Sequence, residues 1–172
     1  MNIDFVKDYE RFGGNEYKYS FPKALLRSLK NHELSYMWWG RALASTQNSL
    51  MRKMYKAVLH HYRKKYGLEI NFKNVGGGIR LIHPWNITVN DNAVLGDNVT
   101  LFKGCTIGVI ESGSNVGNPT IGNNVTVFAN ATICGNIHIG NNVTIAAGSF
   151  VNFDVPDNST VIGNPGIIHY RK

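Results

Sequence analysis

Aliphatic side chains recur at every sixth position over most of the chain from Val75 onward. Four residues after most of them stands a small or second apolar residue, and Gly, Asn or Asp fill many of the positions between, as in LGDNVT and IGNNVT. The aliphatic positions of the repeat are Val75, Leu81, Val89, Leu95, Leu101, Ile107, Ile121, Val127, Ile133, Ile139, Ile145 and Val151.

Each six-residue unit predicts a short strand followed by a corner. The aliphatic side chain points into a coil, and Gly or Asn tolerates the positive φ that tight corners often need. Three units complete a turn of the coil, and single turns cannot bury their apolar face, so stacked turns are required. The pattern therefore predicts a mainly β fold, a parallel β-helix of hexapeptide repeats.

The six-residue spacing fails at two places. The step from Leu81 to Val89 is eight residues, and the step from Ile107 to Ile121 is fourteen. Insertions in stacked-repeat folds become outward loops, which often lie on the binding face. We therefore expect a bulge at the first break and a protruding loop over residues 108–120.

The first 67 residues follow a helical pattern instead. Apolar residues have helix-like spacing in three segments, and Gly67 is suited to end the third. In that third segment, Leu50, Met54, Tyr55, Val58 and Tyr62 are expected to form one apolar stripe. The predicted helical segments are 21–30, 33–44 and 47–66.

The hexapeptide pattern and the helical pattern divide the chain into three regions. We predict a short N-terminal helical region over residues 1–67, a β-helix domain over 68–167 that carries the protruding loop, and a tail over 168–172.

Charge is distributed unevenly along the chain. Residues 1–67 hold 13 of the 18 Lys and Arg but only 5 of the 11 Asp and Glu, whereas residues 68–172 are close to neutral. A basic helical region fits a cap on the coil with a solvated face, and it also fits peripheral contact with the inner face of an anionic membrane. No recognised nucleic-acid-binding module accompanies the charge, so nucleic acid is not an expected partner.

Composition narrows the class of protein. No apolar run is long enough to span a bilayer, and the N-terminus lacks the layout of a secretory signal, so a cytoplasmic protein is expected. Cys105 and Cys134 are expected to be packing residues, and no Cys/His cluster suggests a metal site.

His83 differs from the other five histidines because it falls at the eight-residue break, within LIHPWNIT. A histidine at a bulge is more often structural than catalytic, but its surroundings resemble the serine acetyltransferase-like branch of the hexapeptide acyltransferases. The matching segments are LEI at 68–70, GGGIRLIHP at 76–84, ITVN at 87–90, CTIG at 105–108, NPTIG at 118–122, DVP at 154–156 and IGNP at 162–165.

The resemblance implies a left-handed coil, a homotrimer, and acetyl-CoA bound as co-substrate in clefts between neighbouring coils. It implies that His83 is the general base, because an alcohol must lose a proton as it attacks a thioester. It also implies that Glu69, fourteen residues earlier, orients the imidazole, although a surface acid after a helix is an equally simple interpretation.

Family analogy places acetyl-CoA against small residues of the later turns, where a pantetheine arm lies along the ladder. The basic C-terminal residues are candidates for the nucleotide phosphates. The candidate cofactor-binding residues are Gly108, Ala129, Gly135, Ala146, Ala147, Arg171 and Lys172.

The acceptor is harder to assign because the chain departs from serine acetyltransferases at two places. Ile82 stands where they usually carry an Asp, and Gly117-Asn118-Pro119 stands where they carry Arg-His-Pro. Trp85 is an aromatic surface on which a pyranose ring can stack. The segment YGLEI at 66–70 and the His-Pro at 83–84 also resemble short acetyltransferases of capsule, exopolysaccharide and O-antigen pathways. This resemblance makes a sugar hydroxyl the expected acceptor, with Trp85 and Asn118 as its expected contacts.

Two alternatives remain open on the sequence. One is a serine O-acetyltransferase of cysteine biosynthesis. The other is a non-catalytic β-helix that serves as a scaffold. An acetyl-CoA-dependent O-acetyltransferase acting on a surface-polysaccharide sugar is the main expectation.

Overall fold

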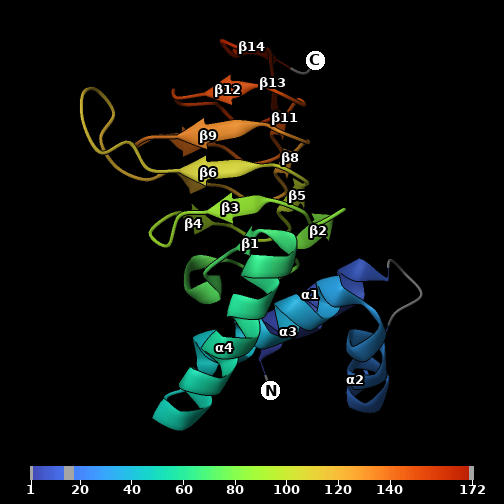
Figure 1. Cartoon of the computed structure of the whole chain (residues 1–172). Coiled ribbons are helices and arrows are strands. Elements are labelled where there is room, and N and C mark those ends of the chain that lie inside the picture. Colours follow the sequence, from blue (N-terminus) through green and yellow to red (C-terminus); the bar gives the residue numbers. More distant parts are fainter. Residues whose placement is uncertain (1, 14–17, 171–172) are drawn as a thin grey trace.

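The structure, a computed structural model, describes residues 2–13 and 18–170. A base of helices lies at one end of a tall coil of short strands, and a loop stands out from the side of the coil (Figure 1). The helices are α1 (Ile3–Phe12), α2 (Phe21–Lys30), α3 (His32–Ser45) and α4 (Ser49–Tyr66), and a 3-10 turn, η2, covers Phe72–Asn74.

The three predicted helices correspond to α2, α3 and α4, and α1 was not predicted. Local chemistry explains their ends. The Asn48 side chain accepts hydrogen bonds from the backbone N–H groups of Leu50 and Met51 at the start of α4. Gly67, in the left-handed region at φ 65°, ends that helix.

The coil has three faces of mainly parallel strands. The β3 face contains β1 (Leu68–Glu69), β3 (Ile87–Val89), β6 (Thr106–Gly108), β9 (Thr132–Cys134) and β12 (Phe150–Val151). The β4 face contains β4 (Val94–Leu95), β7 (Thr120–Ile121) and β10 (His138–Ile139). The β2 face contains β2 (Arg80–Ile82), β5 (Thr100–Phe102), β8 (Thr126–Val127), β11 (Thr144–Ile145), β13 (Ser159–Ile162) and β14 (Ile167–Tyr170).

The predicted core is confirmed. The aliphatic residues from Val89 to Val151 are at most 3% exposed, and they stack in register, as Leu101 does on Val127 and Ile107 on Ile133. At the end of the coil, β14 turns back and pairs antiparallel with β13, so the start of the expected tail is part of a sheet.

Asparagine side chains stabilise one column of corners. Asn98, Asn124, Asn142 and Asn158 all have φ between 56° and 59°. The side-chain amide N–H₂ of each of the first three donates to the Oδ1 of the next residue in the column at 3.1–3.2 Å. Asn tolerates the left-handed region better than other non-glycine residues, so the repeat places it where the chain must turn.

A buried ion pair fastens the helical base to the coil. Arg41 of α3 donates to both carboxylate oxygens of Asp8 of α1, at 2.9 and 3.1 Å, and to the carbonyl oxygens of Val75 and Gly76. Asp8 also accepts a hydrogen bond from the N–H of Ile79 at 2.9 Å. Both side chains are almost fully buried, so the α1–α3 unit is fixed against the first turn of the coil.

The expected apolar stripe of α4 is not buried. No residue of α4 is buried, and Leu50 and Met54 are 75% and 46% exposed. Tyr55 and Tyr62 are partly buried, because their rings pack on α3 at 5.6 Å from Trp39 and 5.5 Å from Tyr36. Helical spacing predicted the helix correctly but could not show which face meets the coil.

Candidate functional site

His83 occupies a tight turn between β2 and β3, at the eight-residue break. Its φ is 50°, a strained value for a residue other than Gly or Asn. The backbone N–H of Trp85 donates to the His83 carbonyl oxygen at 2.8 Å, and the N–H of Asn86 donates to the carbonyl oxygen of Tyr66 at 2.8 Å. The imidazole is exposed, and the Trp85 side chain beside it is 49% exposed.

The turns between the β2 and β3 faces form one column, which we call the β2–β3 corner. The N–H of Gly104 donates to the carbonyl oxygen of Trp85, that of Asn130 to Lys103, and that of Gly148 to Ala129, at 2.8–3.0 Å. Ala129 and Ala147 therefore lie on the same corner as His83. Strands of neighbouring turns are about 4.8 Å apart, so Ala129 lies roughly 10 Å along the coil from the His83 turn.

Gly108 and Gly135 lie on the neighbouring column of turns, the β3–β4 corner, at the ends of β6 and β9. The backbone N–H of Gly135 donates to the Gly108 carbonyl oxygen at 3.4 Å. The 108–120 loop leaves from this corner (Figure 1). Within one copy of the chain, the small residues expected to bind acetyl-CoA are thus divided between two corners.

The 108–120 loop is anchored to the coil. Ile110 and Gly117 exchange backbone hydrogen bonds at 2.9 and 3.1 Å, and the Asn115 amide donates to the carbonyl oxygen of Asn152 at 2.8 Å. At Asn118, the buried Oδ1 has no hydrogen-bond partner among the described residues. Asn118 belongs to the β3–β4 corner, so one copy of the chain does not bring it together with Trp85.

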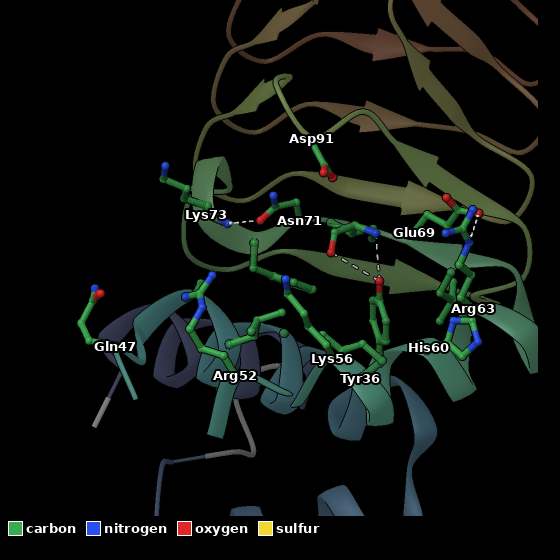
Figure 2. Close-up of a pocket in the computed structure, with 17 residues that line it drawn as sticks. Tyr36, Gln47, Arg52, Lys56, His60, Arg63, Glu69, Asn71, Lys73 and Asp91 are labelled. Atoms are coloured by element: carbon green, nitrogen blue, oxygen red, sulfur yellow. Dashed lines mark hydrogen bonds and ion pairs between the residues drawn. The ribbon is translucent and has the colours of Figure 1, made fainter. Parts of the chain in front are cut away.

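Glu69 lies on β1, opposite Thr88 of β3 in the ladder. Its Oε1 accepts from Nε of Arg63 on α4 at 2.9 Å, and both side chains are partly exposed. Figure 2 shows this pair at one end of a groove. Over residues 2–13 and 18–170, no hydrogen bond joins Glu69 to His83.

The groove has a volume of about 690 Å³ and runs between α3, α4, β1 and η2. Its sides carry the cations Arg52, Lys56, Arg63 and Lys73 together with Glu69 and Asp91 (Figure 2). His83 and Trp85 are not part of its lining. Glu69 therefore lies on the wall of the groove, whereas the exposed His83 turn lies outside it.

Glu33 is a charged residue near His83 that the sequence pattern did not reveal. It lies in the first turn of α3 and is half-buried. Burial raises the pKa of its carboxyl, and the positive charges of His32, His83 and Arg80 act against that rise. Fifty residues separate Glu33 from His83 along the chain, so only the fold reveals that they lie in the same electrostatic environment.

Aromatic rings connect α3 to the histidine turn. His32 stacks on Tyr66 at 4.9 Å with an interplanar angle of 11°, and Tyr66 packs edge-on against Trp85 at 5.0 Å. His32 Nε2 is buried and has no hydrogen-bond partner within the described part of the chain. The start of α3 is thereby held beside the His83 turn.

The remaining expectations concern the nucleotide, a metal ion and a membrane. Arg171 and Lys172, predicted to contact the nucleotide, lie outside the described residues. Among the residues that are described, no group of three His, Cys, Asp or Glu side chains is placed to hold a metal ion, and no helix is long and apolar enough to cross a membrane.

Comparison with known proteins supplies the family context. Residues 118–152 match the family model for the bacterial transferase hexapeptide (six repeats). The chain is 41% identical over 117 residues to the serine acetyltransferase of Synechococcus elongatus, a match that covers 67% of this chain and 48% of the relative. It is 35% identical over 150 residues to probable serine acetyltransferase 5 of rice (Oryza sativa subsp. japonica), covering 84% of this chain and 41% of that protein.

Solved structures show the same architecture. A serine acetyltransferase from Brucella abortus matches with a TM-score of 0.77 and 25% identity, covering 99% of this chain and 69% of that one. The Neisseria gonorrhoeae serine acetyltransferase in complex with serine matches with a TM-score of 0.76 and 26% identity, covering 97% of this chain and 68% of that one. These neighbours establish that the coil is left-handed, as the resemblance implied.

The expectation of a polysaccharide acceptor is wrong. These curated relatives and structural neighbours are serine acetyltransferases, and none of them is a polysaccharide acetyltransferase. The departures at Ile82 and at Gly117-Asn118-Pro119, together with the exposed Trp85, had favoured a sugar. They are local differences within a fold that matches serine acetyltransferase structures over nearly the whole chain. The chain spans about half the length of the curated relatives it matches. Its hexapeptide repeats, left-handed β-helix and helical base match the architecture of these solved serine acetyltransferases.

Proposed function

We propose that this chain is an O-acetyltransferase that transfers the acetyl group of acetyl-CoA to the hydroxyl of L-serine. The observation that carries the proposal is the His83 turn, an exposed imidazole on a strained bulge of a coil similar to serine acetyltransferases over nearly its whole length. Strained backbone persists where the surrounding structure fixes it, and it concentrates at functional sites.

The chemistry assigned to His83 is general-base catalysis. The neutral imidazole removes the proton from the serine hydroxyl as the oxygen attacks the thioester carbonyl carbon. The tetrahedral intermediate then expels the CoA thiolate, and the imidazolium returns the proton to sulfur. The products are O-acetyl-L-serine and CoA, and the enzyme ends in its starting protonation state.

Two copies of the chain are needed for the proposed acetyl-CoA site. Ala129, Ala146 and Ala147 lie on or beside the β2–β3 corner with His83, whereas Gly108 and Gly135 lie on the β3–β4 corner. A single pantetheine arm contacts both sets if it lies between one copy's β2–β3 corner and a neighbour's β3–β4 corner. This supports the homotrimer that the resemblance implies, and it returns Asn118 of the neighbouring copy to the vicinity of His83.

Glu69 remains the proposed orienting group for His83. Both side chains of its ion pair with Arg63 are partly exposed to solvent. Such pairs contribute little to stability, so the Glu69 carboxylate can leave Arg63 and contact another group at little cost. The half-buried position on β1, beside the first strand after the His83 turn, supports the assignment.

The experiment is acetyl transfer by the full chain. Thiol release from acetyl-CoA is followed with L-serine, D-serine, L-threonine and glucose as separate acceptors. We expect turnover with L-serine, and a loss in kcat of about 10²–10⁴-fold in His83→Ala, because that is the usual contribution of a positioned general base. Turnover with glucose but not with L-serine would refute the proposal.

A further inference from the structure

We infer that Glu33 and Arg80 are the acceptor-binding pair of this site, with the Glu33 carboxylate binding the α-ammonium group of L-serine and the Arg80 guanidinium binding its α-carboxylate. The inference rests on the proposed function. It assigns to these two side chains the electrostatic recognition that serine acetyltransferases usually place at the position of Ile82 and in the loop at Gly117.

The first support is the placement of Glu33. His32, the preceding residue, stacks on Tyr66, which packs against Trp85 in the His83 turn. The start of α3 is therefore fixed against the corner that presents His83. Glu33 follows directly, and its charge interacts with those of His83 and Arg80.

The second support is that both charges are available to a ligand. The Glu33 carboxylate accepts no hydrogen bond and forms no ion pair with any residue in 2–13 or 18–170, although it is half-buried. The Arg80 guanidinium makes no hydrogen bond or ion pair there either. A partly desolvated carboxylate without a partner is costly unless a ligand supplies one.

Arg11 provides a useful contrast to Arg80. Its guanidinium donates to the carbonyl oxygens of Gly78 and Val99 and to the hydroxyl of Thr100. Burial lowers the pKa of Arg11, and the positive charge of Arg80 lowers it further. Arg11 is thus occupied in holding α1 against the coil. Arg80 lies on the outward face of β2, three residues before His83, and its guanidinium is available to bind a substrate.

The third support is chemical. L-serine is a zwitterion whose hydroxyl is one carbon from the atom that bears both charges. A carboxylate and a guanidinium beside a general base match its three functional groups, and charge-assisted hydrogen bonds of this type are the strong ones. A neutral sugar offers neither charge.

A structural role for Glu33 makes a different prediction. An acidic residue in the first turn of a helix is stabilised by the helix dipole, and α3 has no side-chain hydrogen bond at its N-cap, Asn31. If that is the only role of Glu33, Glu33→Gln lowers the stability of the helix and leaves acceptor discrimination unchanged.

The test combines two variants with acceptors that lack one charge each. Steady-state acetyl transfer is measured for wild type, Glu33→Gln and Arg80→Gln with L-serine, with 3-hydroxypropionate, which lacks the ammonium group, and with ethanolamine, which lacks the carboxylate. Glu10→Gln, which alters an exposed carboxylate on α1, is the matched control. Glu33→Asp tests rescue by a shorter carboxylate.

We expect Glu33→Gln to raise the KM for L-serine by about 10- to 100-fold, the effect of losing a hydrogen bond to a charged group. The same variant should leave 3-hydroxypropionate turnover and the KM for acetyl-CoA unchanged. Arg80→Gln should show the reciprocal pattern, with ethanolamine as the unaffected acceptor. Glu33→Asp should recover part of the affinity, and Glu10→Gln should match wild type.

The outcomes separate this inference from the proposed function. Wild-type turnover of L-serine that is lost in His83→Ala, with a KM unchanged within about twofold in Glu33→Gln, overturns the acceptor pair and leaves the proposed function standing. Equal losses with L-serine and 3-hydroxypropionate in a normally folded Glu33→Gln also overturn it. No wild-type turnover of L-serine overturns both. Urea midpoints of each variant identify a folding defect.

Discussion

Asp8→Asn and Arg41→Met test the ion pair that fastens the helical base to the coil. Arg41 and Asp8 are 1% and 0% exposed, and Arg41 also donates to two carbonyl oxygens of the segment that enters the coil. Removing Arg41 leaves the Asp8 charge buried without compensation, and removing Asp8 leaves the buried Arg41 only the longer contact with Asp4 at 3.9 Å. Losses of this kind amount to about 3–5 kcal/mol of unfolding free energy.

The double variant distinguishes an ion pair from simple packing. Replacing both residues removes the uncompensated charge, so the double variant should lose less than the sum of the two single losses, by about 2 kcal/mol or more. It should not recover fully, because the carbonyl oxygens of Val75 and Gly76 lose the donors that Arg41 supplies, at about 1 kcal/mol each.

Urea unfolding followed by far-ultraviolet circular dichroism measures these losses, at one fixed protein concentration because oligomers unfold in a concentration-dependent way. Lys7→Met is the control, since the Lys7–Asp97 pair is half-exposed and its removal should leave the urea midpoint within error. Losses below about 1 kcal/mol in both single variants, or strict additivity in the double variant, would show that the buried pair does not fasten the base to the coil.

Two further predictions concern the coil. Burial raises the pKa of the Cys105 thiol to about 11, so at mildly alkaline pH Ellman's reagent should modify Cys105 only after denaturation, and fast labelling of it in the native protein would contradict its packing. Asn124 holds φ 57° in the side-chain ladder, so Asn124→Ala should lower the unfolding free energy by about 1–2 kcal/mol more than Asn124→Gly, which avoids the left-handed strain. Equal urea midpoints for the two variants would show that backbone strain at this corner is negligible.

The sequence predicted the coil well because its rule is local. An inward aliphatic residue and a tight corner repeat every six residues. The buried positions of Ile107 and Ile133 can therefore be predicted from the neighbouring sequence alone. The loop at 108–120 and the bulge at His83 followed from the same count, as departures from it. The helices were predicted for a similar reason, since 3.6-residue spacing and Gly67 are local features.

Contacts between distant parts of the chain were not predictable in this way. Nothing in the spacing showed that Arg41 would be buried with Asp8, or that α4 would leave Leu50 exposed. Glu33 is an ordinary first-turn acid until the stacking of His32 on Tyr66 places it beside the histidine turn. The sugar acceptor was wrong because Ile82 and Trp85 are single positions, whereas the match to serine acetyltransferases extends over most of the chain.

The proposed function depends above all on His83, the proposed general base for transfer of the acetyl group of acetyl-CoA to the hydroxyl of L-serine. Acetyl-CoA labelled with ¹³C in its acetyl group allows product formation to be followed by NMR for wild type and His83→Ala. We expect O-acetyl-L-serine to form in equal amount to the CoA thiol released, and the variant to form it about 10²–10⁴ times more slowly. Wild-type protein that releases no O-acetyl-L-serine above the enzyme-free control, or a variant that retains full rate, would contradict this assignment.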